Sequence, residues 1–300
     1  MPEPRLPLVL RDVTLEVRPG GAVLMGVLNA SPESFSDGPA AGSIDQVLER
    51  GRRLLDEGAR IIDVGGESGV TNRPPLPADE EIRRVVDVVR ELAASGAMVS
   101  VDTWKPAVAR AVLDAGAHLI NDVSGLRHPE IARACAEVGA GLVVMHTRAE
   151  PKVKAFPDYD DVVGDVVTFL KERVEVALAC GLRPEQLVLD PGPDFAKTPA
   201  QTVTVLRHLD EIVALGRPVL LAVSRKDFVG ALTDRRPRER QAGTLAAVAA
   251  GLDAGASILR VHDVAATADF LRVRAALRGD VDVDPALVLP EALRREPGGG

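Results

Sequence analysis

The sequence predicts an α/β fold of the (β/α)8 TIM-barrel class, preceded by a short N-terminal β-hairpin. Short β-branched or Leu-rich segments alternate with Ala- and Leu-rich segments along the chain. The short segments are almost continuously apolar, as are strands buried on both faces of a parallel sheet. Eight such strand–helix units are the number that closes a parallel barrel. The expected strands are 23–29, 60–66, 99–103, 118–125, 141–146, 187–192, 218–226 and 257–264.

Helices are expected between these strands, where apolar residues recur at helical spacing. In the segment 43–57, Val47, Leu48 and Leu54 follow this spacing. Two other helices run into Gly116 and Gly139, and glycine is favoured at a helix end because it adopts the left-handed conformation without strain. The expected helices are 43–57, 104–115, 131–138, 162–179 and 244–254.

The two ends of the chain differ from the repeating pattern. The alternating stretch 8–17 and the following Pro19-Gly20-Gly21 predict a small hairpin that could plug the bottom of the barrel. Residues 281–300 are rich in Asp, Pro, Arg and Gly, so we expect a partly disordered tail after a single barrel domain at 1–280. A doubly wound Rossmann sheet is the alternative, but no G-x-G-x-x-G follows the first strand and polar residues end nearly every strand.

Composition excludes several functional classes. With 46% hydrophobic and 27% charged residues the chain is an ordinary globular protein, and its net charge of −8 means that any phosphate site needs a local cluster of cations. One Trp, one Tyr and six Phe make stacking on single-stranded nucleic acid unexpected. No apolar run reaches the roughly 18 residues of a membrane helix. Two cysteines without paired spacing favour a cytoplasmic location.

Polar residues stand at the ends of nearly all the expected strands. Active sites of such barrels lie at the carboxyl ends of the strands. Asn and Asp are depleted in strands generally, so their recurrence at strand ends predicts a site rather than chance exposure. The strand-end residues are Asn29, Glu67, Asp102, Asn121, Asp122, His146, Asp190, Ser224, Arg225, Lys226, Arg260 and His262.

These residue types divide into two chemical groups. Acceptors and one amide, suited to the edge of a heterocycle with several N–H donors, come from Asp102, Asn121 and Asp190. Cationic donors suited to a phosphate-type oxyanion come from Lys226, Arg260 and His262. Asn29 opens the loop 30–42, a candidate lid. The sequence has no Ser–His–Asp spacing, no H-E-x-x-H and no Walker A motif, so hydrolase and nucleoside-triphosphatase functions are not favoured.

Motifs longer than single residues accompany these positions. They are Asn29-Ala30-Ser31-Pro32, Asp63-Val64-Gly65-Gly66-Glu67-Ser68, Ser100-Val101-Asp102-Thr103, Asn121-Asp122-Val123-Ser124-Gly125, Val144-Met145-His146, Asp190-Pro191-Gly192, Ser224-Arg225-Lys226 and Arg260-Val261-His262. In this order and at strand ends, they resemble the dihydropteroate synthase family, the pterin-binding barrel enzymes of folate biosynthesis. The resemblance covers roughly 23–277.

The resemblance implies a transferase that condenses 6-hydroxymethyl-7,8-dihydropterin pyrophosphate with p-aminobenzoate, giving 7,8-dihydropteroate and pyrophosphate. It implies a homodimer and Mg²⁺ bound near Asn29, with Lys226, Asp102 and Arg260 as the catalytic group. The implied pterin ligands are Asp102, Asn121, Asp190 and Lys226. The implied pyrophosphate ligands are Asn29, Arg260 and His262. The implied apolar walls are Met145 and Phe195.

The chain departs from the family pattern around the arylamine. Gly69 and Val70 interrupt the usual motif after the second strand. Either Thr71 and Arg73 serve as the family Thr and Arg on a reshaped loop, or Gly69 and Val70 replace them. Asp227 stands where the family has a Ser that meets the aminobenzoate carboxylate, and two such charges repel by about 1 kcal/mol in water.

The departures leave alternatives open. One is a pterin-binding paralogue with an altered or lost arylamine substrate, and another is a non-catalytic pterin-binding protein. A methyltransferase acting on methyl-tetrahydrofolate is less favoured, because the S-R-K and R-V-H motifs match the synthases. For His146, a satisfied histidine capping the fifth strand is as good an interpretation as a ligand. The acidic run 158–161 is expected at a helix N-terminus, and Lys152, Lys154 and Lys197 are expected to be solvated.

Overall fold

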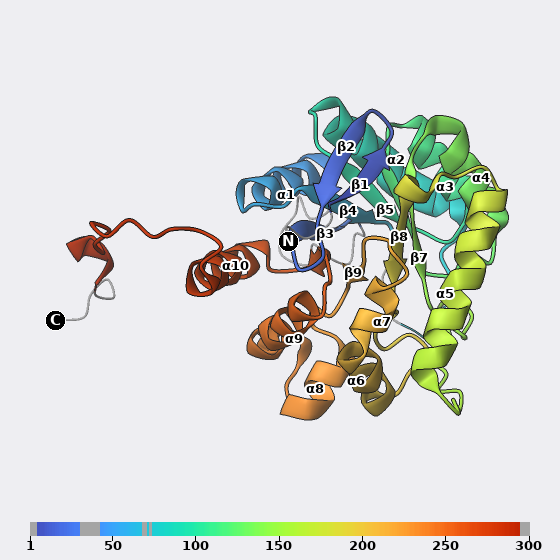
Figure 1. The fold of residues 1–300 in the computed structure, drawn as a ribbon. Coiled ribbons are helices and arrows are strands. Elements are labelled where there is room, and N and C mark those ends of the chain that lie inside the picture. Colours follow the sequence, from blue (N-terminus) through green and yellow to red (C-terminus); the bar gives the residue numbers. More distant parts are fainter. Residues whose placement is uncertain (1–4, 31–42, 68–70, 72–73, 295–300) are drawn as a thin grey trace.

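Eight parallel strands form a barrel with the helices on its outside (Figure 1), which confirms the predicted fold class. The computed structural model describes residues 5–30, 43–67, 71 and 74–294. The strand order in the sheet is β8-β7-β6-β5-β4-β3-β10-β9, and a parallel bridge between Leu189 and Val219 joins its two ends. The connections are strand–helix–strand crossovers, so the strands all point the same way and their carboxyl ends meet at one rim.

The elements follow the chain in the expected alternation. The strands are β1 (Leu6–Leu10), β2 (Val13–Val17), β3 (Val23–Asn29), β4 (Ile61–Gly65), β5 (Val99–Asp102), β6 (Leu119–Asp122), β7 (Gly141–Met145), β8 (Leu187–Asp190), β9 (Leu220–Leu221) and β10 (Ile258–Val261). The α-helices are α1 (Ile44–Asp56), α2 (Ala78–Ala94), α3 (Pro106–Asp114), α4 (Pro129–Val138), α5 (Val162–Ala179), α6 (Pro199–Arg207), α7 (Leu209–Val213), α8 (Asp227–Thr233), α9 (Gln241–Asp253) and α10 (Val264–Arg278).

The N-terminal hairpin covers the bottom of the barrel, as the alternating pattern predicts. β1 and β2 pair antiparallel, with Leu8 opposite Leu15. Leu8, Leu10 and Val17 are buried against the lowest layer of inward-facing strand residues. Arg11, at the turn, fixes the hairpin through hydrogen bonds from its guanidinium to main-chain carbonyls near helix α3.

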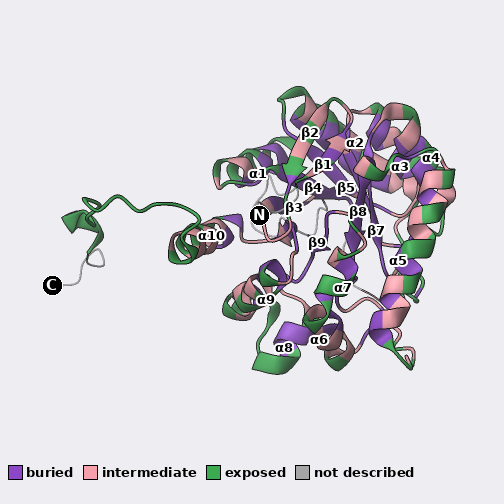
Figure 2. Cartoon of the chain, in the orientation of Figure 1, coloured by how far each residue is buried: buried purple, intermediate pink, exposed green. Residues whose placement is uncertain are grey.

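Strand alternation sets which residues point into the barrel. Neighbouring residues of a strand face opposite sides, so every second residue points inward. The lowest inward layer is apolar and consists of Met25, Ile61, Leu119, Val143, Val188, Leu220 and Ile258. Residues of the opposite parity pack against the helices in the larger core, and both sets are buried (Figure 2).

Strand β3 has the predicted bounds, whereas the other barrel strands are shorter than the apolar runs that predict them. β9 contains only Leu220–Leu221, although the run 218–226 predicts nine residues of strand. Strand pairing stops at Leu221, and the chain turns at Arg225, whose left-handed φ of 60° is incompatible with a strand that continues to residue 226. Helix α5 has both predicted ends, and its N-cap Asp161 accepts hydrogen bonds from the backbone N–H groups of Val163 and Gly164. The acidic run 158–161 therefore begins a helix, as expected.

The chain beyond helix α10 runs away from the barrel (Figure 1), and residues 277–294 are exposed. Among the described residues, no helix is both long and apolar enough to cross a membrane.

Candidate active site

The register of the sheet brings the predicted site residues to the same rim. Asn29 is opposite Gly65, Gly65 is opposite Asp102, and Asp102 is opposite Asn121. On the other side of the barrel, Met145 is opposite Asp190. These pairings place one layer of polar residues directly above the apolar layer that fills the barrel.

Arg260 lies at the centre of this layer and joins two carboxylates. Its Nε donates to Asp63 Oδ2 at 2.6 Å, and its Nη2 donates to Asp102 Oδ2 at 2.8 Å. The amide of Asn121 also donates to Asp63 Oδ2, at 3.2 Å. Three of the predicted residues therefore form one network, organised around a fourth residue, Asp63, that the sequence reasoning did not select.

The alternation of residues along strand β4 predicts that Asp63 points into the barrel. Asp63 stands two residues after the inward-facing Ile61, so its side chain points the same way. Asp63 is 0% exposed. The same step of two leads from Leu119 to Asn121 and from Ile258 to Arg260. An acidic residue within an otherwise apolar buried strand needs a charged partner. The strand-end rule selected Glu67 for this strand instead.

The arrangement of charges shifts the pKa values of the network. Burial raises the pKa of Asp102 to about 7; the neighbouring Arg260 opposes this shift and the Asp63 carboxylate adds to it. Burial would lower the pKa of Arg260, but the two carboxylates outweigh it and the pKa rises, so the guanidinium stays charged. The Asp102 side chain is 25% exposed, whereas that of Asp63 is fully buried. Of the two carboxylates, Asp102 is the one that a ligand can reach.

A second group of site residues lies across the mouth on the loops after β8 and β9. Asp190 is buried, and its Oδ1 accepts a hydrogen bond from the Gly192 N–H at 2.7 Å. Burial raises the pKa of Asp190, although this hydrogen bond opposes the rise. The ammonium of Lys226 lies 4.2 Å from the centre of the Phe195 ring, which is a cation–π contact. Burial lowers the pKa of Lys226, with the nearby carboxylates of Asp194 and Asp190 acting in the opposite direction.

His262 is not the cation that the sequence reasoning expects. Its Nδ1 lies 3.0 Å from Ser224 Oγ. Burial lowers its pKa to about 3, and the positive charges of Arg260, Arg225, Lys226 and Arg50 lower it further. The imidazole is therefore neutral near pH 7 and offers a hydrogen bond rather than a charge.

The cations around His262 include Arg225, a strand-end residue of the predicted set, and Arg50, which the sequence reasoning missed. Arg50 is half-buried on helix α1, and burial and the charge of Arg225 lower its pKa. Arg225 occupies the left-handed turn after β9, where its N–H donates to Thr244 Oγ1 at 3.1 Å. Helical spacing gives no reason to select Arg50. Together these side chains make the local positive cluster that a phosphate site requires in an acidic protein.

Several predicted site residues make no contact with the positive cluster around His262 in the described part of the chain, or lie outside that part. Asn29 and Thr71 are half-buried. Arg73 lies outside the described residues, as do the interrupting Gly69 and Val70 and the candidate lid at 31–42. Met145 is buried at the end of strand β7. Within the part of the chain that is described, no three His, Cys, Asp or Glu side chains are grouped as metal ligands.

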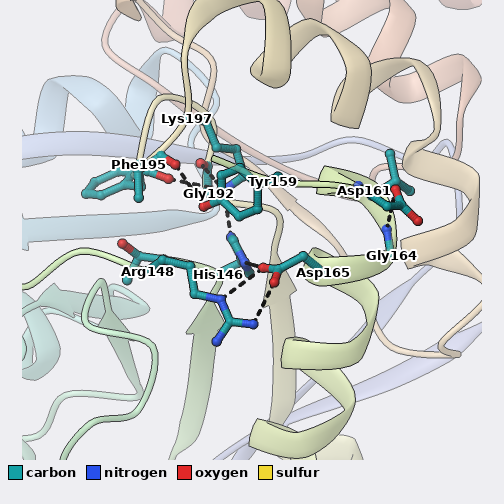
Figure 3. A network of polar contacts seen from close by, with 12 residues as sticks. His146, Arg148, Tyr159, Asp161, Gly164, Asp165, Gly192, Phe195 and Lys197 are labelled. Carbon is teal, nitrogen blue, oxygen red and sulfur yellow. Dashed lines mark hydrogen bonds and ion pairs between the residues drawn. The ribbon is translucent and has the colours of Figure 1, made fainter. Parts of the chain in front are cut away.

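His146 belongs to a buried network rather than to the mouth. It has the parity opposite to Met145, is fully buried, and lies between Asp165 and Lys197 (Figure 3). The expectation that Lys197 is solvated is wrong, because it is 1% exposed. Lys152 is also largely buried, with a side chain 9% exposed and 3.3 Å from Glu67.

Asp227 and Glu67, two further acidic residues of the rim, are paired with cations. Asp227 is 3.2 Å from Arg240 and 3.6 Å from Lys154, and its side chain is 65% exposed. Glu67 accepts from the Lys105 ammonium at 2.8 Å and from the Leu76 N–H at 3.1 Å. The charge of Asp227 is therefore offset by two cations, which the sequence alone does not indicate.

Comparison with known proteins identifies the class to which this barrel belongs. Residues 25–262 match the family model of the pterin binding enzymes. A dihydropteroate synthase of Bacillus subtilis is 40% identical over 257 residues, covering 85% of this chain and 88% of the relative. A probable bifunctional folylpolyglutamate synthase/dihydropteroate synthase of Haloferax volcanii is 43% identical over 86% of this chain, and the chain spans 31% of that longer protein.

Solved structures give the same result. The dihydropteroate synthase of Xanthomonas albilineans with 4-aminobenzoic acid has 41% identity and a TM-score of 0.83, covering 92% of this chain and 98% of that one. The same enzyme in complex with 7,8-dihydropteroate has 42% identity and a TM-score of 0.78, covering 86% and 94%. The chain belongs to the pterin-binding enzymes. Within them it is a transferase of the dihydropteroate synthase family.

Proposed function

We propose that the mouth residues described above carry out the dihydropteroate synthase reaction, joining a dihydropterin pyrophosphate to p-aminobenzoate. The observation that carries this assignment is a buried amide oxygen at the rim. Among the described residues, Asn121 Oδ1 is buried and has no hydrogen-bond partner, as does Asp63 Oδ1 in the fully buried carboxylate beside it. A buried acceptor without a partner costs about 1–3 kcal/mol. A heterocycle bearing N–H donors would satisfy such acceptors on binding.

The pterin half of the site follows from the acceptors and the cation–π pair. Asp102, Asn121 and Asp190 present oxygens from neighbouring parts of the rim, and a pterin edge offers several N–H donors to them. Lys226 and Phe195 form one flank, and Met145 supplies apolar surface. The Xanthomonas enzyme, whose sequence is similar over most of this chain, has been solved with 7,8-dihydropteroate.

The pyrophosphate half follows from the positive cluster. In the reaction, the arylamine nitrogen forms a bond to the pterin methylene carbon while the bond from that carbon to the pyrophosphate oxygen breaks. The amine then loses a proton. Negative charge develops on the departing pyrophosphate, and Lys226, Arg260, Arg225 and the N–H of His262 are the donors that would stabilise it. Arg50 adds to the positive potential from helix α1.

Mg²⁺ is the metal that we propose for this site, with the Asn29 amide oxygen as its protein ligand. The donor set fits, because Mg²⁺ prefers oxygen, keeps several waters and is commonly held by few protein groups together with substrate phosphates. When bound, the ion would neutralise charge on the pyrophosphate. Thr71 and Arg73 remain proposed substrate-binding residues of the reshaped loop after β4.

The arylamine half is where this chain departs from its family. The carboxylate of p-aminobenzoate would meet Asp227, but Arg240 and Lys154 lie close to Asp227 and leave the local charge positive. We therefore favour the synthase over a paralogue with another amine. The solved complex of the Xanthomonas enzyme with 4-aminobenzoic acid supports this choice.

The experiment that tests this function is a pyrophosphate-release assay with dihydropterin pyrophosphate and p-aminobenzoate, with the product identified by mass spectrometry. Release that depends on both substrates, with dihydropteroate formed, supports the synthase. Tight pterin binding without product would instead favour a paralogue or a non-catalytic pterin-binding protein. Omission and re-addition of Mg²⁺ tests the metal in the same assay.

We further propose a cytoplasmic homodimer. Cys135 and Cys180 are both free thiols, as a reducing compartment maintains them. Light scattering at micromolar protein concentration tests the dimer, and a mass equal to that of one 31.7 kDa chain would contradict it.

A further inference from the structure

Lys197 is a buried lysine on the loop between β8 and α6. It is 1% exposed and is among the largest fully buried side chains of the described protein. Its ammonium contacts three acceptors, namely His146 Nδ1 at 2.7 Å, the Gly192 carbonyl at 3.0 Å and the Phe195 carbonyl at 3.1 Å (Figure 3). A lysine ammonium has three N–H donors, so every donor is used. A lysine this deeply buried is costly unless it is paired in this way.

His146, the side-chain partner of Lys197, is held in turn by Asp165. Because His146 Nδ1 accepts from Lys197, the ring proton lies on Nε2 and is donated to Asp165 Oδ1 at 2.8 Å. Arg148 holds the same carboxylate, with contacts of 3.0 Å to Oδ1 and 2.7 Å to Oδ2. His146 follows strand β7 and Asp165 belongs to helix α5, so Lys197 is tied to two regular elements.

The other two acceptors of Lys197 belong to the loop that carries pterin ligands. The Gly192 N–H donates to Asp190 Oδ1, so the position of Gly192 orients this carboxylate. Gly192 has a φ of 64°, and a Cβ there would lie 2.0 Å from the His146 carbonyl oxygen, so only glycine fits. Asp194 and Ala196 also have left-handed φ values, of 63° and 52°. Such a loop needs contacts from outside to hold its conformation.

The loop also contacts the Lys226 cation of the same flank. Phe195, whose carbonyl Lys197 holds, has its ring 4.2 Å from the Lys226 ammonium. A displacement of the loop would therefore shift Gly192, which holds the Asp190 carboxylate, and would move Phe195 relative to Lys226. Lys197 itself is not among the residues that present a donor or acceptor at the mouth, because all three of its donors are used internally.

We propose that Lys197 is a positioning residue of the pterin site, which fixes the loop after β8 so that Asp190 and Phe195 face the pterin. This inference rests on the proposed function, because it assigns pterin binding to that loop. The replacement Lys197→Met removes all three donors while keeping an unbranched side chain. Small displacements of binding groups reduce binding and rate on the order of 10- to 100-fold, and we expect a loss of pterin affinity in this range.

Gln186→Leu is the matched control for a general loss of stability. Gln186 is also 1% exposed and also joins main-chain groups, donating to the Ala140 carbonyl at 2.7 Å and accepting from the Arg183 N–H at 3.0 Å. It lies before β8, at the end of the barrel opposite the mouth. The substitution Gln186→Leu should lower the melting temperature without changing pterin affinity. Asp165→Ala is a second variant, which releases His146 without touching the loop and should weaken pterin binding in the same direction.

The measurement is calorimetric titration of each folded variant with dihydropterin pyrophosphate, together with KM for both substrates. We expect a raised Kd for the pterin in Lys197→Met and Asp165→Ala, and the wild-type Kd in Gln186→Leu. Wild-type affinity in Lys197→Met, or in Asp165→Ala should the first variant not fold, would overturn the positioning role alone. An equal loss in Gln186→Leu would also overturn it. Failure of the wild-type protein to bind the pterin would overturn the proposed function, and this inference with it.

Discussion

Replacing Arg260 with Met tests the charge network at the centre of the mouth. In the wild-type protein the guanidinium contacts Asp63 at 2.6 Å and Asp102 at 2.8 Å. With an effective dielectric constant of about 20, each contact corresponds to about 6 kcal/mol of Coulomb attraction. Desolvation of the three groups offsets most of this. Removing one partner of a buried pair costs about 3–5 kcal/mol, because the remaining charge stays buried.

The loss of folding stability caused by Arg260→Met should depend on pH in a defined direction. Burial already raises the pKa of Asp102 to about 7 in the wild-type protein, against the attraction of Arg260. Without Arg260 that attraction is gone, so the folded protein holds the proton more strongly still. A carboxyl group with a raised folded pKa favours the fold below its unfolded pKa, and this contribution is lost as pH rises through the folded pKa. The destabilisation by Arg260→Met should therefore be larger at pH 8 than at pH 5.

The assay is urea denaturation followed by circular dichroism at several pH values. Arg272→Met is the control, because Arg272 pairs with Asp269 and the two side chains are 77% and 71% exposed. An exposed pair contributes under about 1 kcal/mol, so this variant should be nearly neutral. A loss below about 1 kcal/mol in Arg260→Met, or a loss independent of pH, would refute the account of two buried carboxylates that depend on one guanidinium.

Three further substitutions test separate parts of the site. Asp102→Ala should lower pterin affinity by about 10- to 100-fold in calorimetry, because it removes a charged acceptor; unchanged affinity would refute its assignment as a ligand. Asp227→Ser should change KM for p-aminobenzoate by less than about fivefold, since exposed ion pairs contribute little, and a much larger fall would mean that Asp227 repels the substrate despite Lys154 and Arg240. The pKa of His146 is lowered to about 3, mainly by burial and then by Lys197, so its neutral form favours the fold above pH 6.5 and this contribution is lost as pH falls toward 3. His146→Gln, which keeps an acceptor and a donor, should reduce the slope of unfolding free energy against pH between 6.5 and 4 by about 1.4 kcal/mol per unit; an unchanged slope would contradict it.

The sequence by itself determined the barrel and most of the polar residues that stand at its rim. Buried parallel strands are recognisable because they are apolar on both faces, and this local property depends on short segments alone. The rim follows from the topology, since parallel strands end together, and Asp102, Asn121 and Asp190 stand at such ends. The helix start at Asp161 was also predictable from local sequence, because a capping hydrogen bond joins residues two or three apart.

Only the tertiary structure decided which of these groups are charged and what holds them. Asp63 and Arg260 are 197 residues apart in the chain, and their pairing depends on β4 and β10 flanking β3 in the sheet. Burial made His262 neutral and enclosed Lys197, although both are ordinary polar residues in the sequence. Protonation and pairing depend on desolvation and on charges from distant segments. These quantities exist only after the chain has folded, and no local pattern of residues contains them.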